Sequence, residues 1–130
     1  MMARSIALGV VPMLLVTAAH ANSLKQDQQK VRSWSATAHM VAQAWVVHQM
    51  PRGYVARTLK AAQEGVRDTA RELSAHASAV DARAALRDLA TELDASLTAA
   101  RAAAAHDDRA AMAPVVERLE ATSKALARLP

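Results

Sequence analysis

The sequence predicts an all-α protein, an up-down-up-down antiparallel four-helix bundle preceded by an N-terminal signal peptide. Alanine accounts for 33 of the 130 residues, whereas Phe and Cys are absent and only 3 Gly occur. This composition argues against a β-sandwich, a disulfide scaffold and a Cys-ligated zinc site. Four stretches repeat apolar residues at alternating steps of about 3 and 4, the spacing of one helix face. The breaks between these stretches are short, which favours antiparallel neighbours.

The first 21 residues have the pattern of a secretory signal peptide. Arg4 supplies a positive start, residues 6–19 are apolar, and an Ala-His-Ala sequence ending at Ala21 offers a cleavage site. The apolar run is shorter than the about 20 residues of a comfortable membrane span. We expect cleavage after Ala21, a location in a bacterial periplasm, and no stable membrane span afterwards. An uncleaved N-terminal anchor is the alternative.

Residues 22–130 are expected to form the bundle as one domain. Cleavage removes one of the 16 basic residues and none of the 12 acidic ones, so the net charge falls from +4 to +3. So small a charge does not indicate nucleic-acid binding, and export argues against it. Without Cys, an exported domain depends on its core alone.

The first bundle helix is expected at about 23–49. Its apolar seam repeats at steps of 4 and 3, and the sequence 50–53 then breaks the helix at Pro51. The seam consists of Trp34, Ala38, Val41, Trp45 and His48.

The second and third helices are expected at about 51–75 and 80–105, with a turn at 76–79. Pro51 suits the first turn of the second helix. Both helices have regular apolar stripes. The stripes are Val55, Leu59, Ala62, Val66, Ala70 and Leu73 in the second helix, and Leu86, Leu89, Leu93, Leu97, Ala100 and Ala104 in the third.

The fourth helix is expected at about 109–128. Asp107 or Asp108 would cap its free N–H groups, and Pro114 predicts a kink or a late start. A three-helix core, with the first helix packed loosely or on another subunit, is the alternative to the four-helix bundle.

The first helix carries no charged residue from Ser33 to Met50. Met40, Val46, Val47 and Met50 lie away from its seam, so this helix is apolar on more than one side. These four residues are the candidate interaction face, for a homodimer or a protein partner. A wide core face is the simpler explanation.

Basic residues surround the break between the first two helices. Arg52, Arg57 and Lys60 lie at the N-terminal end of the second helix, where cations oppose the helix dipole. An anion bound by the free N–H groups and these side chains would reverse that penalty. They form a candidate anion site, and a solvated basic end is the alternative.

Trp34, Trp45 and His48 share the seam and form a candidate ligand pocket. A haem in such a bundle needs two axial ligands facing inward from different helices, and the His and Met positions match this poorly. The spacing defines no copper site, and the Glu-x-x-His motif of di-iron bundles is absent. We therefore predict no cofactor and no metal.

No catalytic motif occurs in the sequence, and few loops are available to build a pocket. The sequence therefore favours a non-enzymatic, exported helical bundle that acts by protein–protein contact or self-association. The alternative is a module that binds a small ligand, a metal or haem.

Overall fold

A computed structural model shows four helices within the residues that it describes. It describes the backbone of residues 2–75 and 81–130, and the side chains of residues 23–75 and 82–130. The turn expected at 76–79 lies outside the described residues. The helices are α1 (Met2–Val46), α2 (Arg52–Ala75), α3 (Asp81–Ala105) and α4 (Arg109–Ala127).

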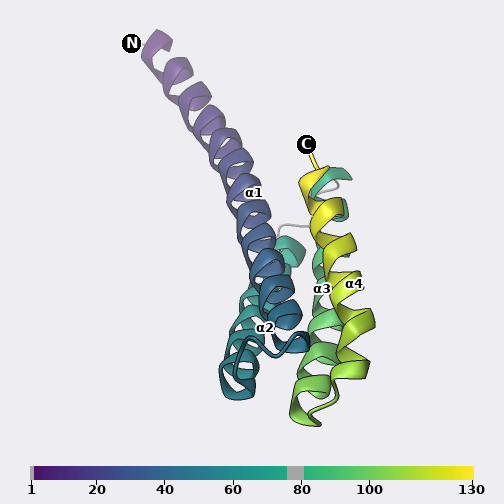
Figure 1. The fold of residues 1–130 in the computed structure, drawn as a ribbon. Coiled ribbons are helices and arrows are strands. Elements are labelled where there is room, and N and C mark those ends of the chain that lie inside the picture. The colour runs from purple at the N-terminus through teal and green to yellow at the C-terminus, as the bar shows by residue number, and fades with distance from the viewer. Residues whose placement is uncertain (1, 76–80) are drawn as a thin grey trace.

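The helices pack as an antiparallel four-helix bundle, as the sequence predicts (Figure 1). Each helix contacts the next one along the chain, and α4 packs back against α1, which closes the bundle. The three-helix alternative is therefore wrong, because α1 packs on both α2 and α4. The α1–α2 and α3–α4 turns lie at the same end of the bundle (Figure 1).

The core contains most residues of the predicted α2 and α3 stripes. In α2 the whole stripe is buried except Ala70, which is partly buried. In α3 the stripe is likewise buried apart from the partly buried Leu89. Alanines on the stripes allow helices to approach closely, while leucines supply most of the buried area. The largest buried side chains are Trp45, Leu59, Leu73, Leu86, Leu93, Leu97, Met112, Leu119 and Leu126.

Helix α1 is one continuous element from Met2, so the backbone has no break at the expected cleavage site. Its N-terminal part extends past the ends of the other helices (Figure 1). Leu24 is the first described side chain that packs against the core. Among the described residues, no helix is long and apolar enough to cross a membrane.

Two helix ends share one backbone geometry. α1 ends at Val46 rather than near Gln49, because His48 turns into the left-handed region with φ 61°. The N–H of Gln49 then bonds the Ala44 carbonyl at 2.8 Å, closing the C-terminal turn of a Schellman motif. Asp107, with φ 51°, ends α3 in the same way.

The start of α4 follows directly on this turn. Asp108 accepts a 3.0 Å hydrogen bond from the Ala111 N–H through its side chain, so Asp108 caps α4 as predicted. The helix begins at Arg109 with Pro114 inside it, so the expected late start is wrong. At α2, the Pro51 carbonyl accepts the N–H of Val55 at 3.1 Å and so begins the helix.

Candidate functional site

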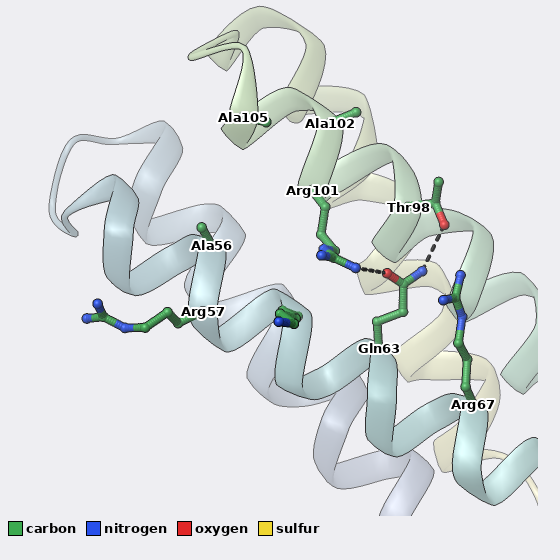
Figure 2. A pocket seen from close by; sticks show the side chains of 9 residues that line it. Ala56, Arg57, Gln63, Arg67, Thr98, Arg101, Ala102 and Ala105 are labelled. Carbon is green, nitrogen blue, oxygen red and sulfur yellow. Dashed lines mark hydrogen bonds between the residues drawn. The ribbon is translucent and has the colours of Figure 1, made fainter.

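A groove of about 570 Å³ lies between α2 and α3 (Figure 2). Four of its nine lining side chains are cationic and none is acidic. The lining residues are Ala56, Arg57, Lys60, Gln63 and Arg67 from α2, and Thr98, Arg101, Ala102 and Ala105 from α3.

The helical repeat explains why these residues share a groove. On α2, Ala56, Lys60, Gln63 and Arg67 follow one another at steps of 4, 3 and 4, with Arg57 next to Ala56, on a row beside the core stripe that runs from Val55 to Val66. On α3 they lie beside Leu97 and Ala104 in the same manner. The groove is therefore the outer edge of the α2–α3 interface. Alanine methyl groups leave it open where larger side chains would fill it.

Gln63 connects the two walls and is only 2% exposed. Its Nε2 donates to the Asp94 carboxylate at 3.0 Å and to the Thr98 hydroxyl at 2.8 Å. Because these partners fix the amide nitrogen on the α3 side, the amide oxygen is free to accept from Arg101 (Figure 2). That bond, from an Arg101 guanidinium nitrogen to Oε1 of Gln63, is 2.7 Å long.

The cations of the groove differ in whether a carboxylate balances their charge. Arg67 donates to Asp94 at 2.8 Å, which makes a neutral ion pair. Arg101 is half-buried, and its partner is the uncharged amide of Gln63. Across the described parts of the chain, no carboxylate forms an ion pair with Arg57, Lys60 or Arg101. The groove therefore carries net positive charge.

The structure divides the predicted anion site. All three residues are exposed, but Arg57 and Lys60 line the groove and Arg52 does not. The Arg57 side chain extends away from the Gln63–Arg101 contact (Figure 2). Sequence reasoning missed Arg67 and Arg101. The sequence does show that both residues lie beside the core stripe of their helix. It does not show which other helix lies next to that edge.

The predicted ligand pocket is not assembled as expected. Trp45 is fully buried, and the Arg109 guanidinium lies 4.6 Å from its ring centroid. Trp34 packs on α2 at Gly65, where an added Cβ would lie 2.5 Å from the indole Cε2. Placing His48 on the seam was wrong, because α1 ends two residues earlier and the imidazole is exposed. Ligand binding by these residues stays a prediction.

The predicted interaction face is split between core and surface. Met40 and Val47 are 58% and 53% exposed. Val46 and Met50 are partly buried and pack against the core. The wide apolar surface of α1 is thus largely used within the bundle, because α1 contacts both α2 and α4. Contact with another protein through the remaining exposed side chains stays a prediction.

A buried carboxyl lies outside the groove, between α1 and α2. Asp27 is 4% exposed. Burial raises its pKa, and so do a hydrogen bond to Glu72 and the negative charge of Glu72. The cations Lys30 and Arg83 act in the opposite direction. The Lys30 ammonium also lies 3.9 Å from the Glu72 carboxylate.

Within the described residues, no group of three or more His, Asp or Glu side chains is placed to hold a metal ion. No family model, no curated protein and no solved structure matches this chain.

Proposed function

We propose that this protein is an exported, non-catalytic four-helix bundle that binds an anionic ligand in the groove between α2 and α3. The observation that carries the proposal is the half-buried guanidinium of Arg101, whose partner is the neutral amide of Gln63. Arg57 and Lys60 line the same groove without a carboxylate partner among the described residues.

The electrostatics favour an anion at this place. A partly desolvated charge without an ionic partner is costly, and the cost grows when like charges lie nearby. A carboxylate or phosphate oxygen can accept the remaining N–H groups of Arg101 in charge-assisted bonds. The Arg67–Asp94–Gln63 contacts hold Arg101 in place beforehand, which lowers the entropy cost of binding.

Calorimetric titration with inorganic phosphate and with acetate, at low ionic strength, tests this proposal. We expect Arg101→Gln to weaken binding by about tenfold, since one charge-assisted interaction is worth about 1.4 kcal/mol or more. Arg128→Gln is the matched control, because Arg128 is exposed at the far end of α4. Equal binding by both variants and the wild type, or no binding at all, would overturn the proposal.

Export is the second part of the proposal. Cleavage after Ala21 would leave Leu24 and every later described core residue in place. Intact-mass analysis of the protein released from the periplasm should give a chain that begins at Asn22. A chain that still begins at Met1 would contradict cleavage and favour a retained anchor.

Self-association is a second candidate function. Met40 and Val47 are exposed, and Val47, which directly follows the last residue of α1, lies about two helical turns after Met40 on the same side. If this face pairs with a second copy, Val47→Glu shifts sedimentation velocity profiles from dimer to monomer. A wild-type protein that sediments as a monomer at high concentration would contradict it.

A further inference from the structure

We infer that the ligand of the α2–α3 groove is an amphiphilic anion, with one carboxylate or phosphate head at Arg101 and an apolar chain along the alanines. This inference rests on the proposed function and specifies the chemical class of the ligand. It follows from how charge and apolar surface are distributed within the groove.

Polar groups occur along the whole groove, since Arg57 and Lys60 lie within one helical turn of Ala56 on α2. Gln63, Thr98 and Arg101 form a connected network (Figure 2). The Arg57 guanidinium extends away from this network rather than toward it (Figure 2). A compact polyvalent anion needs several cations that converge on one point. A single anionic head on Arg101 suits this arrangement better.

Apolar surface continues from the network toward the turns. Ala102 and Ala105 follow Arg101 on α3, and Ala56 lies on α2. Because Gln63 contacts Thr98 and the helices are antiparallel, Ala56 and Ala105 stand opposite each other, seven residues further along each helix. Seven residues correspond to about 10 Å of helix. The groove thus offers methyl groups over a length that a short alkyl chain can cover.

Charge and burial together select against other ligand classes. A neutral apolar ligand would leave Arg101 without an anion, and a cationic amphiphile would be repelled by Arg57, Lys60 and Arg101. A small hydrophilic anion would leave the alanine surface wet. An anion with an apolar chain satisfies both parts of the groove.

The test is calorimetric titration of the full bundle with acetate, butanoate, hexanoate and octanoate below their micelle concentrations. We expect affinity to rise about twofold to fourfold for each added methylene, since the groove is open on one side and burial of each group is partial. Octyltrimethylammonium, which has an alkyl chain of similar length and the opposite charge, is expected not to bind.

Two pairs of variants separate the head from the chain. Arg101→Gln should lower the affinity for octanoate by about tenfold, whereas Arg128→Gln should leave this affinity unchanged. Ala102→Gln places a polar side chain in the groove and should flatten the dependence on chain length. Ala61→Gln, at an exposed α2 alanine outside the groove, should leave the dependence unchanged. Both alanine variants keep a good helix former, so folding is preserved.

The outcomes distinguish this inference from the proposal beneath it. If acetate and phosphate bind through Arg101 but octanoate binds no better than acetate, the inference of an amphiphilic ligand is wrong. The proposed anion site is then still supported. If octanoate binds equally in Ala102→Gln and Ala61→Gln, its chain lies elsewhere and the inference fails. If no anion binds, both the inference and the proposed function are overturned.

Discussion

Two arginines lie between helices on opposite sides of the bundle, and they differ in what surrounds them. Arg32 on α1 donates to the Leu126 carbonyl at 2.9 and 3.0 Å and to the Leu129 carbonyl at 3.2 Å. Arg101 on α3 donates to one amide oxygen of Gln63. The Arg32 guanidinium thus binds the end of α4, where the helix dipole is negative and the carbonyls no longer have the N–H partners of a continuing helix.

A cation between helices can stabilise the interface in which it lies, or it can remain accessible to a ligand. Arg32 completes the α1–α4 interface, which is also joined by the Ser35 and Ser123 hydroxyls at 2.6 Å. Arg101 completes nothing of comparable strength in the α2–α3 interface. We propose that its charge serves a group from outside the chain.

The largest expected difference lies in the stability that is lost when each arginine is replaced. Arg32→Met is expected to lower the free energy of unfolding by about 2 kcal/mol, because carbonyls at the end of α4 lose charged donors. Arg101→Met is expected to lower it by only about 1 kcal/mol, because one donor to the buried Gln63 amide oxygen is lost. Urea unfolding of the two variants measures both values. Equal losses would contradict the division of roles.

The Gln63 amide tests whether Arg101 has to be held in place. Gln63→Leu keeps every cation of the groove but removes the acceptor of Arg101 and the contacts to Asp94 and Thr98. We expect stability to fall by about 1 kcal/mol. Phosphate affinity should fall severalfold, because Arg101 then has to be ordered on binding. Unchanged affinity in calorimetry would show that the network does not position Arg101.

Asp27 extends the comparison to a buried group of the opposite charge. Its raised pKa means that the folded state holds the proton more tightly than the unfolded state. Stability therefore falls as the pH rises from the ordinary value of 3.8 through the raised pKa. Asp27→Asn, which mimics the protonated form beside Glu72, should unfold at higher urea concentration than the wild type near pH 7. A lower midpoint for the variant at that pH would contradict this interpretation.

The smallest expected effect separates stability from binding. His48 is exposed and has φ 61°, a region that costs a side chain but not glycine. His48→Gly is expected to raise the free energy of unfolding by about 0.5 kcal/mol. Phosphate affinity should stay unchanged, because the turn does not line the groove. A loss of stability on thermal unfolding would mean that the imidazole has a structural role.

The fold was largely predictable, because alternating steps of 3 and 4 mark one buried face of each helix. The end of α1 was not, because His48 stands at a left-handed position where glycine is the usual signal. Two of the four cations that line the groove, Arg57 and Lys60, were predicted from the sequence. Arg101 was missed because its approach to Gln63 depends on how α3 packs against α2, which sequence spacing does not determine.

The most direct test follows the side-chain Nε–Hε signals of Arg32 and Arg101 by NMR during a titration with inorganic phosphate at low ionic strength. We predict that the Arg101 signal shifts and saturates, while the Arg32 signal stays in place because α4 carbonyls hold this guanidinium. If the two signals shift alike, or if Arg101 does not respond, the claim that Arg101 binds the anion is contradicted.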